Sequence, residues 1–157
     1  MKTLTKSRFG VALECPTKLR YTGKKEYVSN KQDNEFLQAL AEGGFQVGEL
    51  AKQYYHEGIP VDELGYDKAL SITNKLLERE NVTIFEAAIL FDDRFFIRVD
   101  ILKKVGNKVE LIEVKAKSFD SDNPEFYYKS EKLSNYIRPG WRPYLFDVAF
   151  QTWVMEH

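Results

Sequence analysis

The sequence lacks several features that would quickly assign a chain to a class. It has a single cysteine, Cys15, which excludes an intrachain disulfide and is typical of proteins in a reducing cytosol. It has no apolar run of membrane-spanning length, and residues 1–6 lack the apolar stretch of a signal peptide. We therefore expect a cytoplasmic protein that has no membrane partner.

The chain also lacks an excess of either charge. It has 23 Lys and Arg residues and 24 Asp and Glu residues, so the chain as a whole is not a strongly basic protein that would wrap nucleic acid. The charge is uneven, however, because residues 1–25 hold one acid, Glu14, and many basic residues. This segment is either a phosphate-binding surface or a solvated face. Its basic residues are Lys2, Lys6, Arg8, Lys18, Arg20, Lys24 and Lys25.

The length of 157 residues predicts one domain, with room for a core that needs no disulfide or structural metal. We divide residues 1–157 into a basic N-terminal segment (1–32), a helical region (33–80) and a core segment (81–157). A short first helix is expected to begin at Thr5 or Ser7 and to end before Pro16. A polar connection is then expected over residues 17–32.

Helical spacing of apolar residues begins near Asp33, and Gly43-Gly44 is expected to break or kink this stretch into two helices. A further helix is expected from about Gly65 to Glu80, and a last amphipathic helix from Tyr144 to Glu156 (about 144–156). The side chains expected to face inward between Gly65 and Glu80 are Ala69, Leu70, Ile72, Leu76 and Leu77.

Between these helices the pattern favours strands. The turn residues Asp92-Asp93 and Gly106-Asn107 are expected to join three antiparallel strands into a meander over about 82–117. The sequence therefore predicts an α+β fold, with N-terminal helices packed on a mixed sheet whose core is this meander. The expected strands are Val82–Phe91, Arg94–Lys104 and Val109–Lys117.

The second turn fixes a register. A two-residue turn at Gly106-Asn107 places Asp100 directly opposite Glu113, and Lys115 shares their face of the sheet. Two facing carboxylates destabilise a sheet unless a cation offsets them, and Mg²⁺ binds such oxygen ligands. Lys115 can neutralise part of the charge and hold a water or a phosphate oxygen. The alternative is an ion-pair cluster on the protein surface, which contributes little to folding stability.

These residues resemble a known signature. Asp100, followed by Glu113-Val114-Lys115, is similar to the D…E-x-K motif of the PD-(D/E)xK nuclease superfamily. The surrounding pattern resembles its RecB-type branch, which includes RecB-like exonucleases and iron–sulfur nucleases of CRISPR adaptation. Further similarity lies in Leu4–Phe9 with Cys15-Pro16, in the first-motif stretch Gly44–Ala51, and at Gln151.

The resemblance implies a restriction-endonuclease-like fold and hydrolysis of DNA phosphodiesters with Mg²⁺ or Mn²⁺, in DNA processing, repair or defence. By this resemblance Asp100, Glu113 and the Val114 carbonyl are metal ligands, and Lys115 is the catalytic lysine. It also implies that Glu86 is an additional ligand or a water-orienting acid, and that Gln151 supports the site or contacts substrate.

The chain departs from the family pattern at several positions. Gly48 stands where many members carry a metal-binding histidine, and His56 lies two turns further along. Trp153 and Met155 stand near the position of the usual tyrosine. One cysteine cannot hold an iron–sulfur cluster. The resembled branch usually has a further strand after the helix that carries Gln151, and the sequence stops at His157 without one. We therefore expect a piece of a larger bacterial protein with further domains. The alternative is thus an inactive nuclease-fold module that binds nucleic acid or serves as a scaffold.

Cationic and aromatic residues around the last expected strand suit nucleic acid with single-stranded character, because bases stack on aromatic rings. The alternative is that the aromatic residues pack the loop onto the sheet. The residues expected to contact nucleic acid are Arg8, Lys117, Tyr128 and Arg142, with Arg138, Tyr127, Tyr136 and Trp141 nearby.

Overall fold

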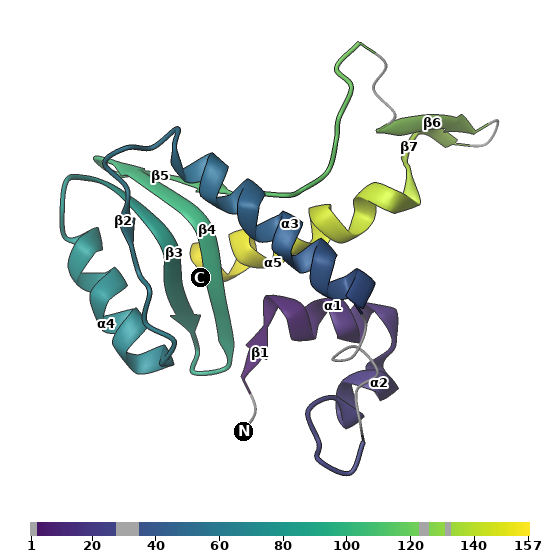
Figure 1. Ribbon diagram of the computed structural model, residues 1–157, viewed down its shortest axis with the longest axis horizontal. Coiled ribbons are helices and arrows are strands. Elements are labelled where there is room, and N and C mark those ends of the chain that lie inside the picture. Colours follow the sequence, from purple (N-terminus) through teal and green to yellow (C-terminus); the bar gives the residue numbers. More distant parts are fainter. Residues whose placement is uncertain (1–2, 28–34, 123–125, 131–132) are drawn as a thin grey trace.

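The chain forms an α+β structure around a five-stranded mixed sheet, and a separate two-stranded hairpin stands apart from that sheet (Figure 1). The α+β class and the mixed sheet are as predicted. No helix in the described part of the chain is long and apolar enough to cross a membrane. This computed structural model describes residues 3–27, 35–122, 126–130 and 133–157, without the side chains of 35–37, 128–130 and 133–135.

The predicted antiparallel meander forms three of the five strands of the sheet, and its first two strands are the central ones. Asp92 and Asp93 both have positive φ, 52° and 50°, as a two-residue hairpin turn of type I′ requires. Gly106 begins the second turn with φ 56°, a conformation that glycine adopts without strain. The strands are β3 (Asn81–Phe91), β4 (Phe95–Val105) and β5 (Lys108–Ile112).

The register between β4 and β5 is the predicted one, with Ile101 opposite Ile112. The predicted extension of the last strand to Lys117 is wrong, because β5 ends at Ile112. Immediately beyond, the backbone N–H of Val114 donates a 2.8 Å hydrogen bond to Oδ2 of Asp100. That donor serves a side chain instead of the strand ladder, so regular pairing stops there.

Two short strands extend the sheet with parallel pairing. Strand β2 (Ile59–Pro60) pairs with β3, and β1 (Leu4–Thr5) pairs with the first residues of β4. Strands β1 and β5 lie on the same side of β4 and run towards each other. Neither pairs with residues 97–100 of β4, which leaves a gap in the ladder on that side.

The N-terminal helices partly follow the prediction. Helix α1 (Lys6–Glu14) begins after Thr5, whose hydroxyl accepts the N-cap hydrogen bond from the Arg8 amide. The predicted polar connection after Pro16 is wrong at its start, because Pro16 opens helix α2 (Pro16–Tyr21). Proline is tolerated at the first helical position, where its missing N–H has no helical partner to lose. Cys15 lies exposed between the two helices.

Helix α3 (Glu35–Lys52) is continuous, so the predicted break at Gly43-Gly44 is wrong. Each glycine costs a helix about 1 kcal/mol relative to alanine, but it can still adopt helical dihedral angles. Good helix formers on both sides, such as Ala39 to Glu42, carry the helix through. The expected start near Asp33 lies outside the described residues.

Helix α4 (Tyr66–Leu77) buries Ala69 and Leu76 as expected. Ile72, which was also expected to face inward, is 37% exposed, and Thr73 is fully buried instead. The Thr73 hydroxyl accepts a 3.0 Å hydrogen bond from the amide of Ala88, which satisfies that buried side chain. The remaining elements are β6 (Tyr127–Ser130), β7 (Leu133–Ile137), the 3₁₀ turn η1 (Pro139–Trp141) and α5 (Arg142–Glu156).

The hydrophobic core lies between α4, the two long strands and α5. Helix α5 also packs against α1, where the rings of Phe9 and Phe150 stack at 4.6 Å. Its amphipathic pattern is incomplete, since Leu145, Phe146 and Trp153 are exposed. The fully buried aliphatic residues of the core include Val61, Ile84, Ile97, Val99, Leu102 and Val154.

Candidate functional site

The predicted acids lie in the gap beside β4. Lys6 follows the last residue of β1, and Glu113 follows the last residue of β5. The two strands point towards each other along β4, so they deliver these side chains to the same place. Asp100 belongs to β4 and lies in the gap itself. The topology therefore brings together residues that are 107 positions apart.

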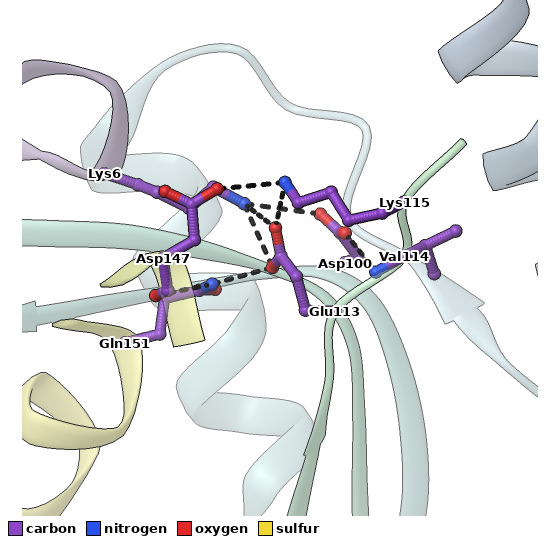
Figure 2. Close-up of polar contacts among 7 residues, drawn as sticks. All are labelled: Lys6, Asp100, Glu113, Val114, Lys115, Asp147 and Gln151. Atoms are coloured by element: carbon purple, nitrogen blue, oxygen red, sulfur yellow. Dashed lines mark hydrogen bonds and ion pairs between the residues drawn. The ribbon is translucent and has the colours of Figure 1, made fainter. Parts of the chain in front are cut away.

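Glu113 is the centre of this cluster (Figure 2). Its carboxylate accepts hydrogen bonds from Lys6 Nζ at 2.8 and 3.1 Å and from Gln151 Nε2 at 2.7 Å. Lys115 Nζ lies 2.6 Å from Oε1, the oxygen that Lys6 approaches most closely. The Glu113 side chain is only 4% exposed, so these partners replace water.

Asp100 has a less satisfied environment. It accepts the Val114 amide, and its Oδ1 lies 3.7 Å from Lys6 Nζ. Burial raises the pKa of Asp100, and the neighbouring Glu113 charge adds to the rise against the opposing charge of Lys6. Asp100 is therefore the acid of the pair that holds its proton more readily.

Glu113 shows the opposite shift. Burial alone would raise the pKa of Glu113, but the hydrogen bonds from Gln151, Lys115 and Lys6 outweigh burial and lower it. Burial likewise would lower the pKa of Lys115, yet its contacts with Glu113 and Asp147 raise it. Both groups are therefore charged over the whole neutral range.

Helix α5 supplies two further members of the cluster, Asp147 and Gln151. The Asp147 carboxylate lies 3.0 Å from Lys115 Nζ, so Lys115 bridges Asp147 and Glu113. Gln151 is fully buried and orients Glu113 through its amide nitrogen, which also donates to the Asp147 carbonyl at 3.2 Å. Its oxygen has no hydrogen-bond partner in the described part of the structure.

Glu86 lies opposite Asp100 at a local irregularity in β3. Pairing with β4 continues in the same register on both sides of Glu86 but is interrupted at Glu86 itself. Its φ is 57°, a left-handed conformation that is strained for this residue type. Burial raises the pKa of Glu86, and the charge of Asp100 raises it further. Glu86 and Asp100 both line a cleft that extends to α3.

A cleft of about 900 Å³ extends from this cluster to α3. Asp100, Val114 and Lys115 lie on the sheet side of the cleft, and Gly48 and His56 line the other side. A Cβ atom added at Gly48 would meet nothing within 4 Å, so a larger side chain has room there. Further lining residues are Phe45, Glu49, Lys52, Phe85, Glu86 and Arg98.

Some of the residues expected at nucleic acid form an aromatic and cationic strip beside Lys115, which consists of Lys117, Tyr136, Trp141 and Arg142 together with Tyr144. Lys117 Nζ lies 4.7 Å from the centre of the Trp141 ring and 5.6 Å from that of Tyr144. The Arg142 guanidinium lies 4.7 Å from the ring of Tyr136. These distances are those of cation–π contacts, which hold aromatic faces and cations side by side.

The other expected contacts are less clearly arranged. The Nε atom of Arg8 is buried and has no hydrogen-bond partner among the described residues. The side chain of Tyr128 lies outside the described part of the chain. Trp141 also contacts Phe119 and Phe126, so packing of the loop, the alternative given above, accounts for part of its environment.

Sequence reasoning missed Lys6 and Asp147 as members of the site. Lys6 belongs to the basic N-terminal segment and to the resembling stretch Leu4–Phe9, but the two-residue strand before it is too short to show a periodic pattern that would place it at the site. Asp147 had a findable signal, since it precedes Gln151 by one helical turn and therefore shares its face of the helix.

Comparison of the chain with protein-family models, with curated proteins and with solved structures gave no match.

Proposed function

We propose that this chain is a divalent-metal-dependent nuclease domain of restriction-endonuclease-like fold that hydrolyses DNA phosphodiester bonds. The observation that carries the proposal is that Asp100 and Lys115 line an open cleft, with the Glu113 carboxylate 2.6 Å from Lys115 Nζ. A structural ion pair needs no such cleft, whereas a hydrolytic site needs access for its substrate.

The donor set fits a hard divalent ion. Asp100 and Glu113 each direct a carboxylate oxygen at one cationic atom, the ammonium nitrogen of Lys6, at 3.7 and 2.8 Å. No group of three or more Asp, Glu, His or Cys side chains that could hold a metal is found among the described residues. Mg²⁺ is commonly held by one or two carboxylates together with water and substrate phosphate. Asp100, Glu113 and the Val114 carbonyl would hold it here.

A bound divalent ion supplies charge for the developing phosphate oxyanion and acidifies a water molecule. The chain's own groups do the rest. Lys115 lines the cleft and would hold the attacking water or a phosphate oxygen. Gln151 fixes the carboxylate of Glu113 through its 2.7 Å hydrogen bond. Glu86, beside Asp100, would orient the water or add a ligand.

The strip beside Lys115 supports a substrate with single-stranded character. Unpaired bases stack on aromatic faces while neighbouring cations bind the phosphates, and Lys117, Trp141 and Tyr144 offer both on one side of the cluster. Arg142 and Tyr136 extend this strip. Contacts through Arg8 and Tyr128 remain part of the proposal.

A second candidate is a catalytically inactive nuclease-fold module that binds nucleic acid or serves as a scaffold in a larger protein. The observation that favours it is the set of ion pairs that Glu113 makes with Lys6 and Lys115. Two ammonium groups already compensate the charges that a metal would neutralise. Gly48 stands in place of the histidine that many members of the resembled family carry, which also favours the inactive module.

Cleavage of labelled single- and double-stranded DNA in Mn²⁺ tests the proposal. The parent should cut, whereas Asp100→Ala and Lys115→Ala should lose about a hundredfold or more, the usual effect of removing one electrostatic catalytic group. Lys18→Ala, which removes an exposed lysine paired with Glu14, is the matched control. An uncleaved substrate with the parent, or equal cleavage by all four proteins, would favour the inactive module.

A further inference from the structure

Lys6 has a position that the proposed nuclease function does not explain. Its ammonium pairs with both proposed metal ligands, Glu113 at 2.8 Å and Asp100 at 3.7 Å. Among the ion pairs of the described residues, no other side chain bridges these two acids. Lys115, the other lysine of the cluster, bridges Glu113 and Asp147 instead. Lys6 thus stands where a divalent ion shared by the two acids would stand (Figure 2).

The backbone of Lys6 is firmly held. Thr5, the residue before it, pairs with Phe96 of β4 and caps helix α1. Helix α1 is in turn fixed to α5 by the stacked rings of Phe9 and Phe150. The Lys6 side chain is 22% exposed, so its flexible methylene chain has a path to solvent. The ammonium can leave the acids without any change in the fold.

The charges of the cluster also favour replacement of the Lys6 ammonium by a divalent ion. Lys6 and Lys115 pair with three carboxylates, those of Asp100, Glu113 and Asp147, and Glu86 adds a further carboxyl group beside Asp100. Carboxyl groups therefore outnumber the lysines, and withdrawal of Lys6 would leave a larger excess of negative charge for a divalent ion to neutralise. A divalent ion at that position interacts more strongly with both carboxylates than a single ammonium does.

We propose that Lys6 is a tethered cation that occupies the divalent-metal position in the metal-free protein and that metal must displace it in order to bind. The proposal rests on the proposed function, because it takes Asp100 and Glu113 to be metal ligands. Lys6 keeps the two acids compensated and the site assembled before metal arrives, and it weakens metal binding by competition. The N-terminal segment thereby sets the metal concentration at which the site fills.

Calorimetric titration of the metal-free protein with Mn²⁺ tests this competition. Lys6→Met, which keeps the length of the side chain without its charge, should bind Mn²⁺ at least about tenfold more tightly than the parent. Lys18→Met, at an exposed lysine, should bind like the parent. In EDTA, thermal unfolding of Lys6→Met should begin at a lower temperature than that of the parent, and added Mn²⁺ should close the gap.

Lys6→Gln is the second variant, because it retains a hydrogen-bond donor for Glu113 if the methionine variant does not fold. It should also bind Mn²⁺ more tightly than the parent. Equal or weaker binding by the folded Lys6 variants would overturn the competition while leaving the proposed function intact if the parent binds Mn²⁺ and cleaves DNA. Absence of Mn²⁺ binding in the parent and in both variants would contradict the competition and the metal site together.

Discussion

The site has two halves that differ in how their residues come together. The hairpin half, Asp100, Glu113 and Lys115, comes from β4 and the chain that leaves β5. The helical half, Lys6 from α1 and Asp147 and Gln151 from α5, comes from opposite ends of the sequence. The hairpin half carries the proposed metal ligands, and the helical half carries groups that compensate and orient Glu113.

The difference shows how a charged cluster can be half-buried without unfolding the sheet around it. Facing carboxylates would destabilise the hairpin by themselves. The helical half supplies Lys6 and the amide of Gln151, so that Glu113 is satisfied in the absence of metal. Glu113 is the residue that joins the two halves, and its removal should have the largest effect.

Glu113→Gln should lower the free energy of unfolding by about 3 kcal/mol, because it leaves Lys6 and Lys115 without their shared buried carboxylate. Urea unfolding in EDTA measures the change. Asp147→Asn is the matched control, since it removes one ion pair of Lys115 and leaves Glu113 in place. Similar losses in the two variants would show that Glu113 does not hold the halves together.

Trp141→Ala tests whether the 3₁₀ turn that leads into α5 binds substrate beside the helical half. Loss of one stacking ring should weaken binding of single-stranded DNA by about 1–3 kcal/mol, the range found for base–aromatic contacts. Fluorescence anisotropy with a labelled oligonucleotide measures the affinity, in EDTA to prevent cleavage. Trp153→Ala, at the distant end of α5, is the matched control and should bind like the parent.

The hairpin half was predictable because local rules determine it. A two-residue turn sets the register, the register sets which residue faces Asp100, and the observed pairs follow that register. Lys6 was not predictable, because its place depends on the parallel pairing of Leu4 and Thr5 with a strand about 90 residues later. The end of β5 depended on a side chain, Asp100, which takes the Val114 amide from the ladder.

The acids of the hairpin half should respond to pH in opposite directions. The pKa of Asp100 is raised above 3.8, so its stabilising contribution is complete below pH 3.8 and is lost as pH rises through the folded pKa. Asp100→Asn should therefore stabilise the protein at pH 7, by about 1 kcal/mol, as when a functional charge is removed. Urea unfolding should show that this gain shrinks as pH falls through the folded pKa towards 3.8.

The contribution of Glu113 to stability should depend on pH in the opposite direction. Its pKa is lowered below 4.5, so its contribution to stability is complete above pH 4.5 and is lost as pH falls through the folded pKa. The deficit of Glu113→Gln should therefore be largest at pH 7 and should shrink in acid. A deficit that does not change with pH would mean that the hydrogen bonds to Glu113 do not depend on its charge.

Gly43→Ala should have the smallest effect and tests whether α3 is independent of both halves. Alanine at this helical position meets no atom within 4 Å, so it should raise the free energy of unfolding by about 0.5–1 kcal/mol. The gain should add to the loss in Glu113→Gln, since the sites share no contact. Urea unfolding measures the change. A lower stability of Gly43→Ala would indicate that the helix is broken at Gly43-Gly44, as the sequence predicts.

The remaining differences between prediction and structure have similar causes. Proline at residue 16 reads as a helix end in the sequence, but it can equally open the next helix. Ile72 follows the helical period yet lies outward, because Thr73 takes the buried position to bond the Ala88 amide. In both cases a single local hydrogen-bond requirement decided between two patterns that the sequence allows.

Calorimetric titration with Mn²⁺ measures whether Asp100 and Glu113 form a divalent-metal site. The titration compares the parent with Glu113→Ala and with Glu110→Ala, which removes an exposed acid of β5. We expect Mn²⁺ to bind the parent and Glu110→Ala, and binding to be lost in Glu113→Ala. Undiminished binding in Glu113→Ala, or no binding in the parent, would contradict it.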